Sequence, residues 1–349
     1  MPKNHLYGPL MSLGRGRDAR DALAAFQLFD VDAGTVLTEP GDRDDSLIVV
    51  GRGRVDVSVG ELQVGQMGPG QLVGEICLFA DHPRTSRAVA ATPCDLLVID
   101  RDGFDKLLRA GNSVASGLQR VAMTQLGQQR VVIQKALAKF SEGKDAPEEP
   151  SDGMFGRLAN MFGMVPQVRE ARADAVKVLR STPLFSSAPP SHVEMIAEHM
   201  DPVQVDDGAL LFAQSRVASR WFLLTKGDVE IVVSRSDDDA DTDEVFPVAE
   251  VGRGAVIGLT AIMSNAPHAA SAIARSEVSA LAVSTRSWSE LSSAHQPYAN
   301  TLRQALLRAL CGQVVETRRM LLRLQLRHRE TGDIGDTGVF RMRGRQEHI

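Results

Sequence analysis

The chain carries one sequence pattern twice, and this repeat limits the folds it can adopt. Early positions of the two copies align at a separation of 174 residues, and later positions align at a separation of 184. The aligned pairs are Gly34–Gly208 and Gly53–Gly227 at the first separation, and Gly74–Gly258, Pro83–Pro267, Leu97–Leu281, Phe104–Trp288 and Leu107–Leu291 at the second. Such constant spacing indicates a duplicated domain. The separation changes in a window that contains the acidic tract 237–244, so we expect one hairpin loop to be longer in the second copy.

Each copy has the pattern of a β-rich domain. In the first copy, "SLIVV" and "VDVSV" flank "GRGR", and apolar–polar alternation around a glycine turn predicts a hairpin. The stretch "FLLTKGDVEIVV" repeats this pattern in the second copy. Several short strands with Gly and Pro turns predict a mainly β fold with some α, in the form of a small barrel or double-sheet roll.

Each copy is predicted to end in a long helix with an apolar stripe. The first helix runs from Ser113 to Phe140, and Arg130 interrupts its stripe. The stripe residues are Met123, Leu126, Ile133, Leu137 and Phe140 in the first copy, and Leu302, Leu306, Leu310, Val314, Leu321 and Leu324 in the second. Such a stripe packs on its parent domain, or it pairs with another chain to form a homodimer, and the sequence leaves both open.

A polar segment separates the two copies. Ser141 to Gly153 is charged and rich in Pro and Gly, which predicts a flexible linker. The segment Met154 to Met164 has an apolar helical face that either packs on the second domain or docks into a partner's groove. We therefore divide the chain into an N-terminal arm (1–27), a first domain with its helix (28–140), a linker with a short helix (141–170), a second domain with its helix (171–330) and a tail (331–349).

Charge and cysteine content narrow the partners and the compartment. The net charge of -5 argues against a protein built to sit on nucleic acid. The 3 cysteines are too few and too scattered for a disulfide framework, which fits a reducing compartment. No stretch has the apolar length of a signal peptide or a membrane span. We expect a cytoplasmic protein that contacts neither DNA nor membrane.

One segment of the first copy, "VGEICLFADHPRTSRAVA" (73–90), has a distinctive pattern. Gly74 and Glu75 precede a short apolar turn, and Pro-Arg-Thr-Ser follows it at 83–86. This arrangement resembles the phosphate-binding cassette of the cyclic nucleotide-binding domain, a family that includes the regulatory subunits of protein kinase A and the catabolite activator protein. The resemblance covers residues 31–140 and 178–329. It implies two eight-stranded, jelly-roll-like β-rolls, each followed by a long helix.

The resemblance also implies a ligand site in the first copy. Its residues are Gly74, Glu75, Ile76, Cys77, Arg84, Thr85 and Ser86. Arg84 would hold the cyclic phosphate with its planar pair of donors, and Glu75 would accept a hydrogen bond from the ribose 2′-OH. Gly74 would let the backbone approach, so that N–H groups of the following turn face the anion. Thr85 and Ser86 would add hydroxyl groups near the phosphate.

Neither the base nor the role of this charged pair is fixed by the sequence alone. Family resemblance favours cAMP, whereas the hydroxyl of Thr85 keeps cGMP open as the ligand. Thr124 on the following helix is a candidate contact for the base. The alternative without a ligand is that Glu75 and Arg84 form an incidental surface ion pair, which would contribute about 0–1 kcal/mol to stability.

The second copy lacks the chemistry of the cassette. Leu259, His268 and Ala269 stand where the first copy has Glu75, Arg84 and Thr85. A neutral imidazole with one donor is a poor substitute for a guanidinium. We therefore expect the second domain to bind no cyclic nucleotide and to serve as a structural or partner-binding copy. A different ligand, with His268 as one contact, is the weaker alternative.

Several signatures of related functions are missing. The chain has no helix-turn-helix after either long helix, and no inhibitor sequence of the kinase-regulatory kind. The adjacent pair Arg318-Arg319 lies in a predicted helix, and we expect the arginines around it to form a solvated face. We find no catalytic residues and no metal site, since the histidines lack metal-ligand spacing and the acidic tract lacks the Gly and Glu of a calcium loop.

The sequence therefore predicts a cytoplasmic, bacterial-type allosteric regulator that is not an enzyme. Its first domain would bind a cyclic mononucleotide and reposition the helix Ser113 to Phe140, changing contacts with an unknown protein partner or a dimer mate. One alternative is a scaffold in which both rolls bind proteins without a ligand. A second alternative is a transcription regulator, against which the acidic balance argues.

Overall fold

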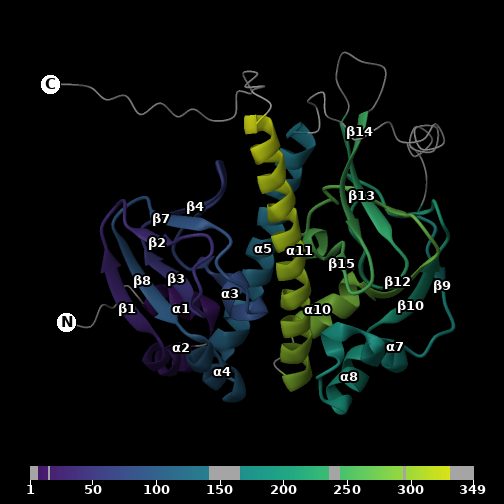
Figure 1. The fold of residues 1–349 in the computed structure, drawn as a ribbon. Helices are drawn as coiled ribbons and strands as arrows, with labels where there is room; N and C mark the ends of the chain where they lie inside the picture. The colour runs from purple at the N-terminus through teal and green to yellow at the C-terminus, as the bar shows by residue number, and fades with distance from the viewer. Residues whose placement is uncertain (1–6, 15, 141–165, 236–243, 294–295, 331–349) are drawn as a thin grey trace.

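The computed structural model describes residues 7–14, 16–140, 166–235, 244–293 and 296–330. Two β-rolls lie side by side, and two long helices stand between them (Figure 1). These helices are α5 (Ser113–Phe140) and α11 (Pro297–Glu330). The segments expected to form the linker (141–153) and the short apolar helix (154–164) lie outside the described residues, as does the tail.

The first roll consists of two four-stranded sheets, with the strand orders β1-β8-β3-β6 and β2-β7-β4-β5. The strands are β1 (Gln27–Val31), β2 (Val36–Thr38), β3 (Leu47–Arg52), β4 (Val55–Val59), β5 (Leu62–Met67), β6 (Leu72–Val73), β7 (Arg87–Ala90) and β8 (Cys94–Ile99). In β4 the valines are buried and the residues between them are not, which is the alternation expected of a strand with one face on a core. The predicted mainly β roll is confirmed.

The second roll repeats this topology. Its sheets have the orders β15-β12-β17-β10-β9 and β11-β16-β13-β14, so the extra strand β9 extends one edge. The strands are β9 (Arg169–Glu170), β10 (Asp201–Val205), β11 (Leu210–Phe212), β12 (Arg220–Lys226), β13 (Val229–Arg235), β14 (Glu244–Val251), β15 (Val256–Ile257), β16 (Ser271–Ala274) and β17 (Val278–Ser284).

The two copies differ in one hairpin. In the first roll Val59 pairs with Leu62 across a short turn between β4 and β5. In the second roll the equivalent residues, Val233 and Phe246, also pair, but the chain between them is longer. The inserted residues therefore lie between β13 and β14, where the sequence predicted the longer loop.

Short helices complete both rolls. In the first half they are α1 (Tyr7–Leu13), α2 (Gly16–Ala22), η2 (Leu23–Ala25), α3 (Glu75–Ala80) and α4 (Arg101–Arg109), and in the second half α7 (Ala175–Ser181), η3 (Pro183–Phe185), α8 (Pro190–Ala197), α9 (Leu259–Ser264) and α10 (Thr285–Ser293). Helices α1 and α2 pack into the core of the first roll, where Leu10 and Ala22 are fully buried. A Cβ on Gly117 of α5 would lie 1.9 Å from the carbonyl oxygen of Leu13, so glycine is what allows α1 to pack this closely on α5.

The predicted apolar stripes of α5 and α11 are used within the chain. Leu118 and Leu126 of α5 are fully buried, and Leu306 and Leu310 of α11 are 1% exposed. All four belong to one core cluster that joins the two rolls. These stripes could pair with a second chain only if the two rolls separated.

The contacts between α5 and α11 show that a pseudo-two-fold axis relates the two copies. Ser116 Oγ donates a hydrogen bond to Asn300 Oδ1 at 3.1 Å. Arg303 Nε donates a hydrogen bond to Gln119 Oε1, also at 3.1 Å. Each pair is 184 residues apart, which is the repeat separation, so each residue contacts its own equivalent. Equivalent residues touch only near a two-fold axis, and the chain therefore has the symmetry of a two-fold dimer within one polypeptide.

Candidate ligand-binding sites

The cassette of the first roll begins at a glycine that no other residue can replace without strain. Gly74 precedes α3 and has a φ of 95°, in the left-handed region. A Cβ at this position would lie 1.7 Å from Nη1 of Arg84. The glycine therefore provides both the turn into α3 and the space in which the Arg84 side chain lies.

The guanidinium of Arg84 is held in place on one side only. Its Nε donates to Asp44 Oδ2 at 2.8 Å, and its Nη2 donates to Asp44 Oδ1 and to the carbonyl and hydroxyl oxygens of Ser46. Nη1 is buried and has no hydrogen-bond partner among the described residues. The Arg84 side chain is 4% exposed, so Nη1 lies shielded from solvent beside Gly74.

Asp44 fixes the orientation of that arginine. Partial burial acts to raise the pKa of Asp44, but the hydrogen bonds from Arg84 and Ser46 outweigh it and lower the pKa below its usual value. Asp44 therefore stays ionised and holds Arg84 at Nε and Nη2. Nothing in the sequence distinguished Asp44 from the neighbouring Asp42 and Asp45, since the pairing depends on the folded loop.

Glu75 lies at the start of α3 and is 4% exposed. Its Oε1 accepts a hydrogen bond from Nε2 of Gln129 on α5, at 3.3 Å. Glu75 and Arg84 are both buried within the same cassette, and Arg84 pairs with Asp44 instead of Glu75. The interpretation of Glu75 and Arg84 as an incidental surface ion pair is therefore wrong.

Arg318 of α11 reaches this site from the other half of the chain. Its Nη1 donates to Thr85 Oγ1, and its Nη2 donates to Gln129 Oε1 at 2.5 Å. The expectation of a solvated arginine face is wrong for Arg318, which is 3% exposed. Burial lowers its pKa, and the charge of nearby Glu75 acts in the opposite direction. Arg319 is exposed and pairs with Glu316, as a solvated face would predict.

The remaining predicted site residues lie close by. Ile76 and Cys77 are 3% and 2% exposed. The N–H of Cys77 donates to the Gly74 carbonyl at 3.1 Å, and the Cys77 carbonyl accepts a hydrogen bond from Arg101 Nη2 at 2.9 Å. Ser86 is partly exposed, and its carbonyl oxygen accepts a hydrogen bond from Thr38 Oγ1 at 3.2 Å. The structure thus brings the predicted set together around one turn.

The second roll keeps the backbone frame of the cassette. Gly258 has a φ of 80° before α9, and Asn265 after that helix is left-handed, as Asp81 is after α3. The N–H of His268 donates to the Arg216 carbonyl at 2.9 Å, which repeats the 2.8 Å bond from Arg84 to the Asp42 carbonyl. The duplicated frame is therefore preserved.

The side chains in this second frame are different. Leu259 is 1% exposed and joins the core cluster that contains α11. The His268 ring stacks on Phe212 with a centroid separation of 4.0 Å and an interplanar angle of 13°. Burial lowers the pKa of His268 to about 4, so its imidazole is neutral at pH 7. The guanidinium of the first cassette is thus replaced by an uncharged aromatic pair.

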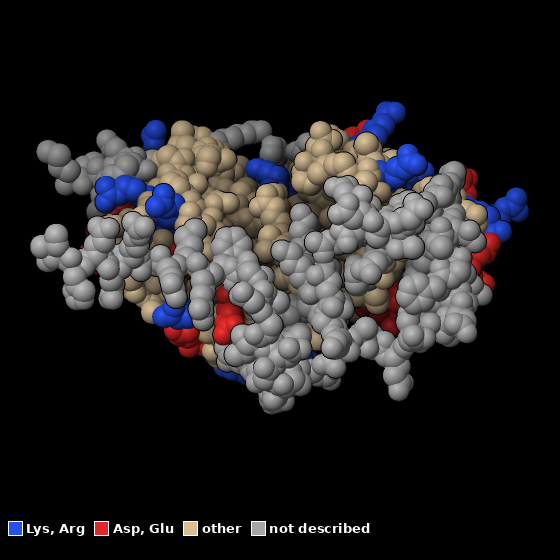
Figure 2. All heavy atoms as spheres, turned by 90° about the horizontal axis from the view of Figure 1, so that it is seen from above, with Lys and Arg blue, Asp and Glu red and all other residues tan. Residues whose placement is uncertain are grey.

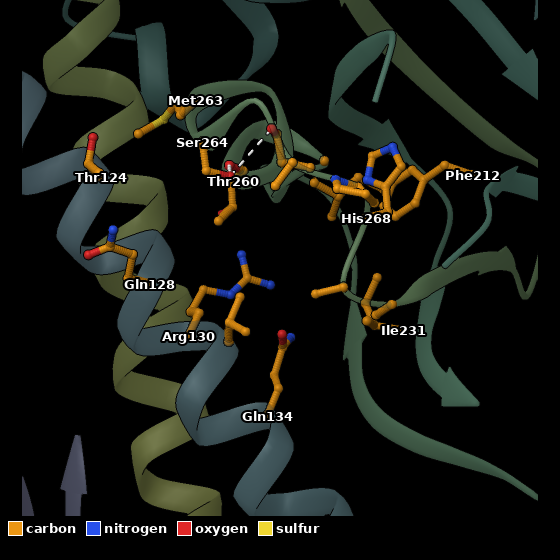
Figure 3. A pocket seen from close by; sticks show the side chains of 18 residues that line it. Thr124, Gln128, Arg130, Gln134, Phe212, Ile231, Thr260, Met263, Ser264 and His268 are labelled. Atoms are coloured by element: carbon orange, nitrogen blue, oxygen red, sulfur yellow. Dashed lines mark hydrogen bonds between the residues drawn. The ribbon is translucent and has the colours of Figure 1, made fainter. Parts of the chain in front are cut away.

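A cavity of about 360 Å³ opens between this second frame and α5. Figure 3 shows Thr124, Gln128, Arg130 and Gln134 along its α5 wall, facing Thr260 and His268. Thr124 was a candidate base contact for the first roll, but it lines the cavity of the second roll. Helix α5 therefore lines the cavity of the second roll, and α11 contributes Arg318 to the first cassette, where Gln129 of α5 also lies.

Comparison with known proteins places this geometry in a family. The model described as "Cyclic nucleotide-binding domain" matches residues 28–110 and 202–295, which together make up half of the chain. The chain belongs to the cyclic nucleotide-binding domain family. Both matched ranges lie within the two rolls, so the duplication seen in the sequence is a duplication of this domain.

Individual relatives cover less of the molecule. A cAMP-dependent protein kinase regulatory subunit from Eremothecium gossypii is 37% identical over 82 residues, which are 24% of this chain and 18% of that protein. Among solved structures, the regulatory domain of Toxoplasma gondii PKA with cAMP is 17% identical, with a TM-score of 0.31, and 86% of this chain and 94% of that chain are covered. A cyclic nucleotide-binding domain from Methylobacillus flagellatus is 18% identical, with a TM-score of 0.37, and the match covers 43% of this chain and 82% of that chain.

Two further features bear on the class of protein. Within the described residues, no helix combines the length and apolarity needed to cross a bilayer, and no group of His, Cys, Asp and Glu is arranged to hold a metal. In the view of Figure 2, the described Lys and Arg side chains that can be seen lie at separate points among other residues.

Proposed function

We propose that this protein is a regulatory protein whose first cyclic nucleotide-binding domain binds one cyclic mononucleotide. The observation that carries the proposal is the unpartnered, buried Nη1 of Arg84 beside Gly74. A buried cation with free donors is costly unless an anion completes its hydrogen bonds. The cyclic phosphate is an anion that can accept the remaining hydrogen bonds of this guanidinium.

The other side chains of the cassette discriminate the rest of the ligand. Glu75 accepts a hydrogen bond from the ribose 2′-OH, a group that 2′-deoxy compounds lack. The N–H groups of Glu75 and Ile76 at the start of α3 point away from the helix body and face the phosphate with Arg84. cAMP is the favoured ligand because a relative from Eremothecium gossypii is a cAMP-dependent protein kinase regulatory subunit, while Thr85 keeps cGMP as the alternative.

Ligand binding is coupled to α11. In the present structure the hydroxyl of Thr85 accepts a hydrogen bond from Arg318, and Gln129 bridges Arg318 to Glu75. A nucleotide that engages Thr85 and Glu75 competes with those contacts. Binding therefore shifts α11 and α5 relative to the first roll, and this shift changes the surface offered to a protein partner.

The same proposal includes three expectations from the sequence. They are the division into domains, a cytoplasmic location and a non-catalytic role. The three free cysteines, Cys77, Cys94 and Cys311, are all buried, which suits a reducing compartment. The second roll takes no part in nucleotide binding, since Leu259 and His268 offer neither an acceptor for the ribose nor a charge for the phosphate.

The test is calorimetric titration of the full chain and of Arg84→Gln with cAMP and cGMP. Loss of a charge-assisted hydrogen bond costs about 1.5–3 kcal/mol, so we expect at least a tenfold loss of affinity. The matched control is Arg87→Gln, three residues away, because Arg87 is exposed and pairs with Glu39 outside the cassette. Equal affinities for the wild-type chain and Arg84→Gln would refute the proposed role of the cassette.

A further inference from the structure

The cavity of the second roll has the size of a ligand site, about 360 Å³. Its α5 wall carries polar groups, whereas the wall formed by the roll is mostly apolar. The apolar residues that matter here are Ile231, Ile257, Met263, Ala266 and Pro267. A ligand that fills this space therefore meets hydrocarbon on one side and polar groups on the other.

Arg130 supplies the one positive charge among the residues that line this cavity. Its side chain extends from α5 toward the second roll (Figure 3). Its Nη1 donates to the neutral amide of Gln313 at 2.5 Å, and no ion pair joins Arg130 to a carboxylate among the described residues. Burial lowers the pKa of Arg130 to about 10, so the guanidinium remains charged at pH 7. A partly buried guanidinium without a counterion is a site for an anion.

The opposite wall determines what the rest of the ligand can be. The neutral ring of His268 stacks on Phe212, and together they present an aromatic pair next to Pro267. Leu259 replaces the carboxylate that the first cassette uses, so no acidic acceptor faces a ribose hydroxyl here. This wall matches a flat or aliphatic body, and it lacks the carboxylate that would accept a hydrogen bond from a ribose 2′-OH.

We propose that the cavity of the second roll binds a small organic carboxylate with an apolar, preferably aromatic, body. The carboxylate pairs with Arg130 of α5, and the body packs on the wall of His268, Phe212 and Ile257. The orientation is opposite to that in the first cassette, where the anion-binding arginine belongs to the roll itself. A cyclic nucleotide turned this way would meet no carboxylate at the position of Leu259 to bind its ribose 2′-OH, so we do not expect it to bind here.

This proposal does not depend on nucleotide binding by the first roll, although one helix serves both sites. Gln129 of α5 contacts Glu75 in the first site, and the next residue, Arg130, faces the second cavity. A carboxylate on Arg130 therefore constrains the same turn of α5 that closes the first site.

The test uses 2-naphthoate as the probe and its neutral isostere 2-naphthamide as the comparison, both titrated into the full chain by fluorescence. We expect saturable binding of naphthoate at one site and at least tenfold weaker binding of the amide. Arg130→Gln should weaken naphthoate at least tenfold while leaving the amide unchanged, and Arg130→Lys should lose less. The matched control is Arg120→Gln, because Arg120 is an exposed residue of the same helix outside the cavity.

Two further variants keep the test decisive. Ala266→Phe fills the cavity from the roll side and should abolish naphthoate binding without touching Arg130. Arg84→Gln should leave naphthoate binding intact, which separates this site from the first cassette. The proposal is overturned if naphthoate shows no saturable binding, if acid and amide bind equally, if Arg130→Gln has no effect, or if cAMP displaces naphthoate from a chain that carries Arg84→Gln.

Discussion

At the scale of single residues, the main feature of the first cassette is an arginine that an acid orients and whose hydrogen bonds are incomplete. Asp44 and Ser46 engage Nε and Nη2 of Arg84, and Nη1 is the donor that remains. Glu75 lies next to Gly74 and contacts an amide of α5 rather than a cation at ion-pair distance. In the proposed site, the charge of Arg84 and the acceptor of Glu75 would serve two different parts of one ligand.

The role of Glu75 can be tested through the ribose hydroxyl. In Glu75→Gln we expect cAMP to bind about tenfold more weakly, because the acceptor loses its charge and the hydrogen bond weakens by about 1.5 kcal/mol. The affinity for 2′-deoxy-cAMP should change much less, since that ligand has no 2′-OH. Parallel titrations of both nucleotides measure this difference, and an equal loss for both would show that Glu75 acts only on the structure of the cassette.

His268 makes the stability of the second roll depend on pH. Its pKa is about 4 in the folded chain against 6.5 when exposed, so below pH 6.5 the unfolded state binds the proton first. The free energy of unfolding therefore falls as pH drops from 6.5 towards 4, by about 2–3 kcal/mol in total. His268→Phe keeps the stacking on Phe212 and should remove this part of the pH dependence. Denaturant unfolding of the wild-type chain and of His268→Phe at pH 7.5 and 4.5 measures this dependence. An identical pH dependence in the two proteins would contradict the role given to His268.

At the scale of elements, α5 and α11 each complete the site of the other half. Arg318 from α11 contacts Thr85, and Arg130 from α5 faces His268 across the second cavity.

The sequence predicted the features that depend on local patterns or on the repeat. These are the strand pattern, the longer second hairpin, both long helices and the cassette. The contacts of Arg318, Gln129 and Thr124 could not be predicted, since they depend on how the two halves pack. One sign of the second cavity is visible in the sequence, namely that the charged residue Arg130 interrupts the apolar stripe of α5.

The contact of Arg318 predicts how α11 influences ligand affinity. In Arg318→Gln we expect cyclic nucleotide to bind about fivefold to tenfold more tightly, because a competing hydrogen bond of about 1–1.5 kcal/mol to Thr85 is removed. Arg319→Gln is the control, because Arg319 is the next residue along α11, is exposed and pairs with Glu316. Isothermal titration distinguishes the outcomes. Weaker binding in Arg318→Gln would mean that Arg318 contacts the nucleotide directly.

At the scale of the whole molecule, the chain has the symmetry of a dimer but unequal sites. Equivalent residues meet at Ser116–Asn300 and Gln119–Arg303, so the halves are related by a pseudo-two-fold axis. Only the first half has the glutamate and arginine of the cassette, whereas the second has Leu259 and His268. Duplication within one chain allows this divergence, because each half can change without changing the other. In a homodimer every substitution would appear in both sites.

The number of nucleotide sites per chain is the most direct test of this account. We would titrate the purified chain with cAMP, and then with cGMP, in a calorimeter and fit the stoichiometry. The account predicts one site per chain for the tighter nucleotide. Two sites would contradict the inactive second cassette, and no binding of either nucleotide would contradict the central claim that Arg84 and Glu75 form a cyclic nucleotide site.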